Sequence, residues 1–254
     1  MHIVVVVAHP DEESLRFGGT IVKHVRAGHK ATIITLTRGG MGHASMPIPQ
    51  LRATRVREIS KAAGILGADV VVMEDFEDQW IPADPLAVAR TLIDPLRALK
   101  PDVLLCHDPT VLPCDQSNTA RGVLVAATRI YFPLLKTEHP SVPIPDIYHL
   151  PEMNQRPDIY IDITDVMDVR LAAMRCQQTQ IFWARDLYWD AAPQDIKGMD
   201  DAAAEEAWIQ QQLRTEVAYG AKCGAEYAEA YVAFRSPLRM ARSTFPTREE
   251  ITAS

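Results

Sequence analysis

The chain of 254 residues has few cysteines, few aromatic residues and no apolar run long enough to span a membrane. Its four cysteines are too widely spaced for a disulfide framework, and none belongs to a CxxC pair of the kind found in thiolate zinc sites. The apolar run of residues 3–8 is far shorter than the ~18 residues of a membrane span, and no signal-like segment accompanies it. These absences predict a cytoplasmic protein with reduced thiols that is neither exported nor anchored in a membrane.

The chain also has fewer positive than negative side chains. It contains 26 Lys and Arg and 33 Asp and Glu, which gives a formal net charge of −7 at pH 7. This balance lacks the basic footprint of a protein that binds nucleic-acid phosphates, so we expect no nucleic-acid partner. What the chain does have is 47% hydrophobic and 23% charged residues, the composition of a globular protein with a sizeable core.

Short β-branched runs alternate with longer segments of helical period, which is typical of βαβ units and predicts an α/β layered fold with a mainly parallel sheet. We expect strands over residues 3–7, 31–36, 68–73, 102–106 and 158–163. We expect helices over residues 18–28, 51–67, 85–99, 117–130, 165–185 and 200–219, with residues 223–234 continuing the last one. The proline-rich residues 133–157 are interpreted as an irregular crossover loop. Residues 1–254 then form a single domain, with a core of about residues 1–185 and a C-terminal helical extension over about residues 186–254.

The most informative local pattern is Ala8-His9-Pro10-Asp11-Glu12-Glu13, which begins where the first expected strand ends. Ligands bind beyond the carboxyl ends of the strands in open parallel sheets, so this segment lies where a site is expected. His9 and Glu12 are three residues apart on a turn fixed by Pro10 and can converge on one metal ion, while Asp11 can face a water on that metal. The alternative is an ordinary strand-to-helix turn with acidic residues near the helix start.

Several further motifs occur in order along the chain. They are Gly18-Gly19-Thr20 after AHPDEE, residues 36–43 (LTRGGMGH), a helix that carries Arg55, Glu58 and Leu66-Gly67, then Pro101-Asp102-Val103, and residues 158–165 (DIYIDITD). Together they resemble the LmbE/PIG-L family, zinc-dependent enzymes that remove N-acyl groups, mostly from amino sugars and their conjugates. The resemblance covers about residues 1–185 and implies a Rossmann-like fold with the site at the strand ends.

The resemblance also implies roles for individual residues. His9 and Glu12 correspond to metal ligands, with Glu12 where the family more often has Asp. Asp11 corresponds to the catalytic general base that takes a proton from water. Arg55 corresponds to an arginine that binds substrate in some members, and a helix-surface salt bridge to Glu58 is an equally good interpretation.

The chain departs from the family at the third metal ligand. Members supply it from an HPDH segment whose first histidine helps to stabilise the oxyanion, whereas this chain has Pro113-Cys114-Asp115-Gln116. Asp115 keeps the aspartate and is expected to contact substrate, but Pro113 and Gln116 replace both histidines. A later histidine is replaced as well, since residues 175–180 (RCQQTQ) stand where a segment ending H-x-S-Q is usual.

Three residues could complete the metal site. Gln116 could bind through its side-chain oxygen, Asp115 could swing in as an anionic ligand, or His107 could reach across from the end of the fourth strand. His107 is more simply interpreted as a pocket residue that contacts substrate. An amide oxygen is a weaker zinc ligand than imidazole, so we expect a divalent metal, zinc by resemblance, held with a weakened third ligand.

The resulting hypothesis is a metal-dependent hydrolase that removes an N-acyl group, in the simplest case acetyl, from an amino-sugar-like or other small amide substrate. The competing hypothesis is a catalytically degenerate relative, weakly metallated or metal-free, that binds a small ligand or performs altered chemistry. The replacements at Pro113 and Gln116 motivate this second reading. A homo-oligomer is expected only by analogy with the family.

Overall fold

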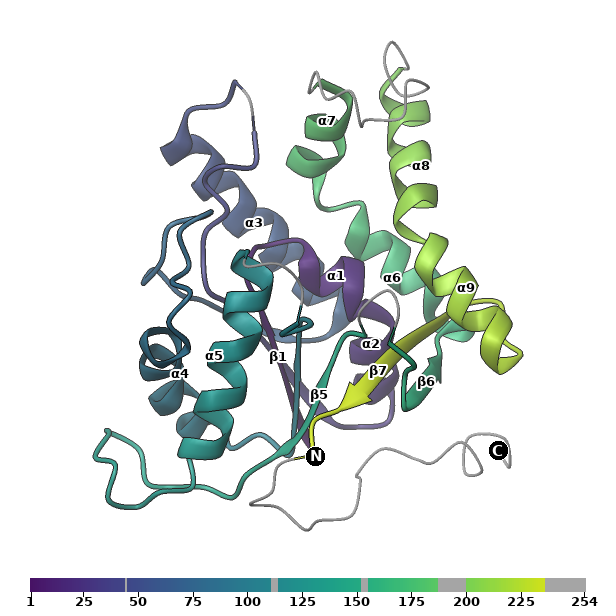
Figure 1. Ribbon diagram of the computed structural model, residues 1–254. Helices are drawn as coiled ribbons and strands as arrows, with labels where there is room; N and C mark the ends of the chain where they lie inside the picture. The colour runs from purple at the N-terminus through teal and green to yellow at the C-terminus, as the bar shows by residue number, and fades with distance from the viewer. Residues whose placement is uncertain (44, 111–113, 152–154, 187–199, 236–254) are drawn as a thin grey trace.

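A seven-stranded sheet in the order β3-β2-β1-β4-β5-β7-β6 organises the chain (Figure 1). The computed structural model describes residues 1–43, 45–110, 114–151, 155–186 and 200–235. The strands are β1 (His2–Val7), β2 (Lys30–Thr35), β3 (Asp69–Val72), β4 (Val103–Cys106), β5 (Asp146–His149), β6 (Ile159–Asp162) and β7 (Ala228–Ala233). β1 to β5 pair in parallel, and β7 runs antiparallel to both β5 and β6. The predicted α/β fold with a mainly parallel sheet is confirmed.

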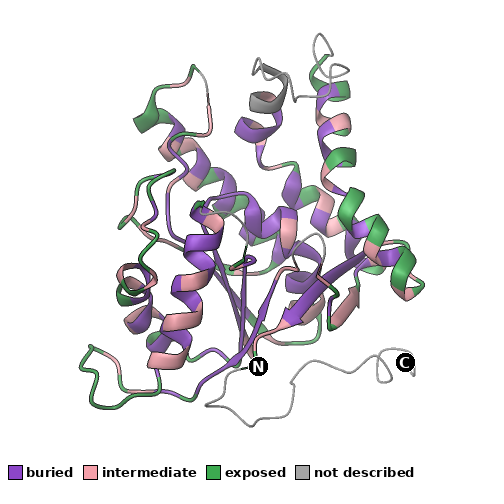
Figure 2. Cartoon of the chain, in the orientation of Figure 1, coloured by how far each residue is buried: buried purple, intermediate pink, exposed green. Residues whose placement is uncertain are grey.

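Two layers of helices cover the sheet because side chains of a strand alternate between its two faces. In β1, Ile3, Val5 and Val7 belong to one buried cluster, and Val4 and Val6 belong to the other. The first cluster includes residues of α2 (Gly18–Arg26), α3 (Ile48–Leu66), α6 (Met167–Met174) and α8 (Asp201–Gln212), and the second includes residues of α4 (Pro85–Leu99) and α5 (Asp115–Arg129). Figure 2 shows the central strands and the helix surfaces that face them as buried.

Two strands occur where the sequence predicted other structure. β5 lies within residues 133–157, which we expected to be an irregular loop; it is four residues long and is followed closely by Pro151, so it carries little local strand signal. It forms because its backbone pairs with β4, with Val103 opposite Asp146. β7 lies within residues 223–234, which we expected to extend a helix. Both expectations were wrong because long-range pairing outweighs local propensity.

The side chains of β7 show what holds this alanine-rich segment in the sheet. Glu229 is buried, and its carboxylate accepts the backbone N–H groups of Gly19 at 2.8 Å and Thr20 at 2.9 Å, at the start of α2. The hydroxyl of Tyr231 donates to Thr20 Oγ1 at 2.9 Å. These partners are at least 209 positions apart in the chain, so no local pattern could reveal them.

The last third of the chain differs from the sequence prediction in its helices as well. The expected helix over residues 165–185 is divided into η1 (Thr164–Val166), α6 and α7 (Gln178–Asp186). The expected helix over residues 200–219 is divided into α8 and α9 (Arg214–Cys223), and the chain then returns to the main sheet through β7. None of the helices that the structure describes combines the length and apolarity that a membrane crossing requires.

Candidate active site

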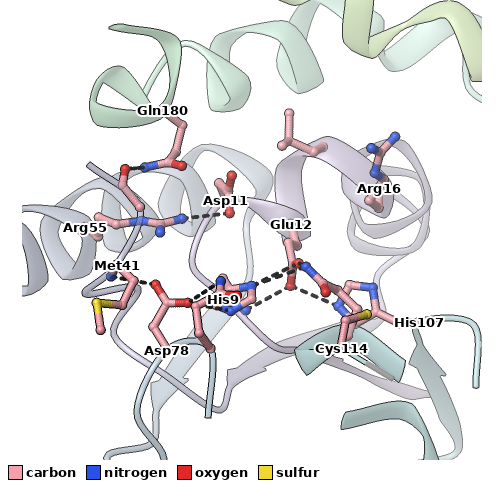
Figure 3. Close-up of a pocket in the computed structure, with 14 residues that line it drawn as sticks. His9, Asp11, Glu12, Arg16, Met41, Arg55, Asp78, His107, Cys114 and Gln180 are labelled. Carbon is pink, nitrogen blue, oxygen red and sulfur yellow. Dashed lines mark hydrogen bonds and ion pairs between the residues drawn. The ribbon is translucent and has the colours of Figure 1, made fainter. Parts of the chain in front are cut away.

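A cavity of about 670 Å³ opens beyond the carboxyl ends of β1 and β4 (Figure 3). The turn after β1 and the short helix α1 (Glu12–Arg16) contribute much of its lining. Six of the seven residues predicted for the site line it: His9, Asp11, Glu12, Arg55, His107 and Gln116. The seventh, Asp115, lies behind His9 and is not part of the lining. Pro113, the replacement at the oxyanion position, lies outside the described residues.

The turn after β1 has an unusual backbone at Asp11. Its φ of 111° is uncommon for a residue other than glycine, and such a conformation persists only when neighbouring groups hold it. The Glu13 carboxyl group accepts the backbone N–H of Asp11 at 2.9 Å, and the Ser14 hydroxyl donates to the Asp11 carbonyl at 2.9 Å. Gln177 donates in turn to Glu13 at 2.8 Å, so α1 and the segment before α7 fix this turn together.

Glu12 is the most heavily bonded carboxylate of the pocket. Its Oε2 accepts the backbone N–H groups of Ala8 and His9, each at 2.9 Å, and lies 2.9 Å from His107 Nε2. Its Oε1 accepts the carboxamide N–H of Gln116 at 2.8 Å. Burial raises the pKa of Glu12, but the neighbouring His107 and His9 outweigh it and hold that pKa well below its usual range. The carboxylate is therefore ionised and fixed in direction.

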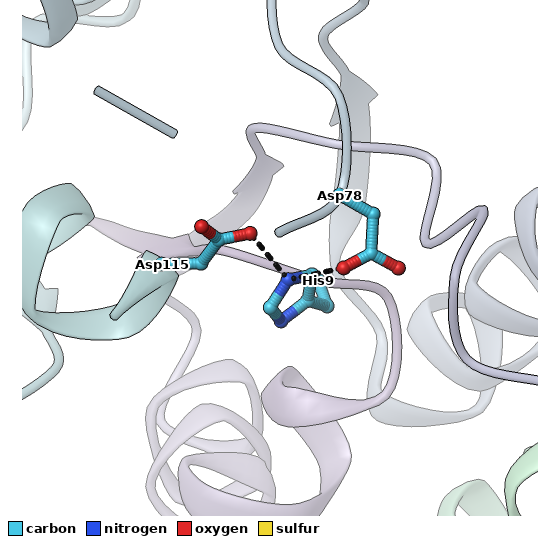
Figure 4. Close-up of side chains that lie close together, drawn as sticks. All are labelled: His9, Asp78 and Asp115. Carbon is cyan, nitrogen blue, oxygen red and sulfur yellow. Dashed lines mark hydrogen bonds and ion pairs between the residues drawn. The ribbon is translucent and has the colours of Figure 1, made fainter. Parts of the chain in front are cut away.

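His9 faces different partners with its two ring nitrogens. Nδ1 lies 3.3 Å from Glu12 Oε1 and 3.4 Å from Gln116 Nε2. Nε2 lies 3.0 Å from one oxygen of Asp78 and 3.0 Å from one oxygen of Asp115 (Figure 4). Burial lowers the pKa of His9, but Glu12, Asp115 and Asp78 together raise it well above its usual value. A metal ion on this ring would displace the proton that these carboxylates favour.

Backbone N–H groups hold the two aspartates beside His9 Nε2. Asp115 accepts from Gln79 at 2.6 Å and from Ile81 at 3.1 Å, and Asp78 accepts from Met41 at 2.8 Å. Burial raises the pKa of Asp78, but His9 and the Met41 N–H lower it to about 2. The sequence analysis missed Asp78, although it ends an acidic segment, residues 74–78, directly after β3, where strand-end side chains approach the site.

Arg55 is committed to the turn that carries Asp11. It donates to Asp11 Oδ1 at 2.9 Å, to the Pro10 carbonyl and to the Gly39 carbonyl at 3.3 Å. Gly39 has a φ of 64°, and a Cβ there would overlap the Arg55 guanidinium, so only glycine allows this close approach. Burial raises the pKa of Asp11 to about 6, although Arg55 opposes the rise.

The alternative of a surface salt bridge between Arg55 and Glu58 is wrong. Arg55 is only 3% exposed and lies in the pocket, where its ion pair is with Asp11. Glu58 instead accepts the backbone N–H and the hydroxyl of Thr179, at 2.9 and 2.6 Å. Arg55 lines the cavity, so it is in a position to contact a substrate. That role stays a prediction.

Two sets of donors around His9 could hold a divalent metal. On the Nδ1 side, Glu12 and Gln116 lie 3.3 and 3.4 Å from the ring and 2.8 Å from each other. Donor atoms of a tetrahedral zinc site with bonds of about 2.0–2.2 Å are about 3.3–3.6 Å apart, so this set fits the ion with small adjustments and a carboxamide turned to present its oxygen. On the Nε2 side, Asp78 and Asp115 complete a second set.

The Nδ1 set suits a catalytic metal better than the Nε2 set. A catalytic ion needs an open coordination position, and His9, Glu12 and Gln116 all line the cavity, whereas Asp115 does not. With an ion at Nδ1, Asp78 and Asp115 would take the place of the carboxylates that commonly orient a metal-binding imidazole through its other nitrogen. Of the three ways to complete the site considered from the sequence, Gln116 lies beside His9 Nδ1 and Asp115 beside Nε2, whereas His107 contacts Glu12; which of them completes the site stays a prediction.

Comparisons with known proteins agree with the motifs and with the fold. The family model described as PIG-L, GlcNAc-PI de-N-acetylase, matches residues 4–127. A diacetylchitobiose deacetylase from Thermococcus kodakarensis is 25% identical over 236 residues, covering 89% of this chain and 80% of that protein. A 4-oxalmesaconate hydratase from Pseudomonas putida is 30% identical over 194 residues, covering 70% of this chain and 73% of that protein. The crystal structure of N,N'-diacetylchitobiose deacetylase from Pyrococcus horikoshii is 24% identical, with a TM-score of 0.71 over 92% of this chain and 83% of that one.

Proposed function

The chain belongs to the PIG-L family, and on that premise we propose that it is a metal-dependent hydrolase that removes an N-acyl group, in the simplest case acetyl, from an amino-sugar-like small amide. The observation that carries the proposal is the meeting of His9, Glu12 and Gln116 at the cavity wall, with the carboxylate of Asp11 beside them. The deacetylase relatives named for amino-sugar substrates support the same reaction class.

The residues of the pocket divide the work of amide hydrolysis. A divalent ion, when bound, polarises the substrate carbonyl and makes water more acidic. Asp11 accepts a proton as water adds to the carbonyl carbon, and the proton passes to the nitrogen as the C–N bond breaks, giving a carboxylic acid and an amine; the acid then transfers its proton to the amine or to solvent. Arg55 and Glu13 fix the position of Asp11, since one pairs with its side chain and the other with its backbone N–H.

A second candidate reaction is the addition of water to a carbon–carbon double bond. The relative that is 30% identical to this chain is named as a hydratase. Hydration is therefore a specific example of the altered chemistry that the sequence analysis considered. Both reactions add water, and in either one Asp11 is placed in the cavity to accept a proton from that water. We favour hydrolysis because the matched family model is described by a de-N-acetylase.

A product assay separates the two reactions. We expect zinc-loaded protein to release acetate from N-acetylglucosamine or N,N'-diacetylchitobiose, and to lose that activity after treatment with a chelator. Parallel incubation with 4-oxalmesaconate, followed by loss of its conjugated ultraviolet absorbance, tests hydration. Hydration without acetate release from either sugar would reject the hydrolase proposal in favour of the second candidate.

Replacing Gln116 by histidine should strengthen zinc binding. The substitution puts an imidazole where the carboxamide already lies 3.4 Å from His9 Nδ1 and 2.8 Å from Glu12. We expect the affinity to rise tenfold or more, about 1.4 kcal/mol, measured by competitive zinc titration at one pH. Asp78→Asn is the matched comparison, because an ion at Nδ1 would lose about 10–100-fold in affinity with its orienting carboxylate, whereas an ion at Nε2 would lose a direct ligand and more affinity. A large loss in Asp78→Asn with no gain in Gln116→His would place the ion at Nε2 instead.

A further inference from the structure

Arg16 is the second arginine that lines the pocket, and its surroundings differ from those of Arg55. Arg55 is bound to Asp11 and to two backbone carbonyls. Arg16 also lines the cavity and is partly buried, yet it makes no hydrogen bond or ion pair with any residue in the part of the chain that the structure describes. In Figure 3 its guanidinium lies away from the cluster formed by Glu12, His9 and His107.

Within the described part of the chain, the lack of a hydrogen bond or ion pair to Arg16 has a structural cause in α1. Glu12 lies four residues before Arg16, the spacing at which a glutamate and an arginine normally pair on a helix. Here both oxygens of Glu12 are taken by backbone N–H groups, His107 and Gln116, so Arg16 is left without its natural counter-charge. Residues four apart have their Cβ atoms about 5–6 Å apart, so Arg16 lies one helical turn from a proposed metal ligand.

We propose that Arg16 binds an anionic group of the substrate, a carboxylate or a phosphate, while the acyl group occupies the metal-binding end of the pocket. A guanidinium presents paired N–H donors that match both oxyanions, and a partly buried one gains more from such a contact than an exposed one. This inference rests on the proposed hydrolase function and narrows its substrates to N-acyl compounds that carry a negative charge.

Binding of three related sugars tests the proposal without requiring turnover. The probes are N-acetylglucosamine, which is neutral, N-acetylmuramic acid, which adds a carboxylate, and N-acetylglucosamine 6-phosphate. Their dissociation constants are measured by calorimetry with zinc-loaded wild type, Arg16→Met, Arg16→Lys and Arg90→Met. Arg90 is exposed on α4, on the other side of the sheet, so its variant removes the same charge away from the pocket.

We expect wild type and Arg90→Met to bind at least one anionic sugar roughly ten- to a hundredfold more tightly than the neutral one. Arg16→Met should abolish that preference and Arg16→Lys should retain part of it, which also shows that position 16 tolerates substitution. The sugar that is preferred distinguishes a carboxylate from a phosphate. A preference that survives Arg16→Met would place the anion on the metal or elsewhere and overturn the proposal, as would equal or undetectable binding of all three sugars by wild type.

Acetate release, measured on the same samples, keeps this proposal separate from the function on which it rests. Tight binding of an anionic sugar through Arg16 without acetate release would retain the anion site and reject the hydrolase. Equal release of acetate from all three sugars, with no preference in binding, would retain the hydrolase and reject the anion site.

Discussion

Asp11→Asn is expected to lower turnover by about 10²–10⁴-fold while leaving the bound metal in place. An amide cannot take up the proton that water gives up, yet it has nearly the shape of the carboxylate. Asparagine also tolerates positive φ better than most residues, so the backbone of 111° at this position should be kept. The measurements are steady-state kinetics and the zinc content of the purified variant.

Asp84→Asn is the matched control for the loss of Asp11. Asp84 precedes α4 as Asp11 precedes α1, but it is exposed and outside the cavity lining. Asparagine and aspartate cap helices about equally well, so its turnover and stability should stay near wild type. If Asp11→Asn kept turnover within a few-fold of wild type with metal bound, Asp11 would not be the base.

Removing His9 and Glu12 together should eliminate metal binding. The double variant His9→Ala, Glu12→Ala takes away two of the three donors on the Nδ1 side and also the imidazole that the Nε2 set requires. Neither set then keeps enough donors to hold the ion, so zinc content by elemental analysis should fall to background. The sheet should persist in circular dichroism, because the two residues follow β1 and do not belong to it.

A second histidine and carboxylate pair provides the control for that experiment. His139 and Asp94 are 3.1 Å apart and form, with Glu138, another group of potential donors far from the cavity lining. The variant His139→Ala, Asp94→Ala should keep the zinc content of wild type. If it lost zinc while His9→Ala, Glu12→Ala retained it, the metal centre would lie at the second pair and the assignment at His9 would be wrong.

The elements that the sequence predicted well are those whose signal is local. The five aliphatic residues of the first strand, the helix over residues 85–99 and the turn AHPDEE were recognisable from short patterns, and α4 has the predicted bounds. β5 and β7 were not recognisable, since one is four residues long and the other is rich in alanine and glutamate. Their conformation depends on β4 and on the start of α2, which lie far away in the chain.

The residues of the pocket also differ in whether a local sequence pattern could identify them. Sequence motifs and the family resemblance singled out His9, Asp11, Glu12, Arg55 and Gln116, which the structure brings to one cavity, while their roles stay predictions. Asp78 and Arg16 carry no such pattern, and their importance follows from what lies next to them. A charged residue is common in any sequence, whereas one that faces His9, or that lacks a partner inside a pocket, is identified only in three dimensions.

The sequence by itself determined which chemical groups the protein brings to its cavity: an imidazole, several carboxylates and a carboxamide, with neither histidine of the HPDH segment. Only the tertiary structure decided how they are used. It turns Nδ1 of His9 toward Glu12 and Gln116 and Nε2 toward Asp78 and Asp115, and it places Arg16 in the cavity lining without an ion pair to any described residue. The physical reason is that a ligand set or a counter-charge depends on distances of a few ångströms between segments that the sheet brings together.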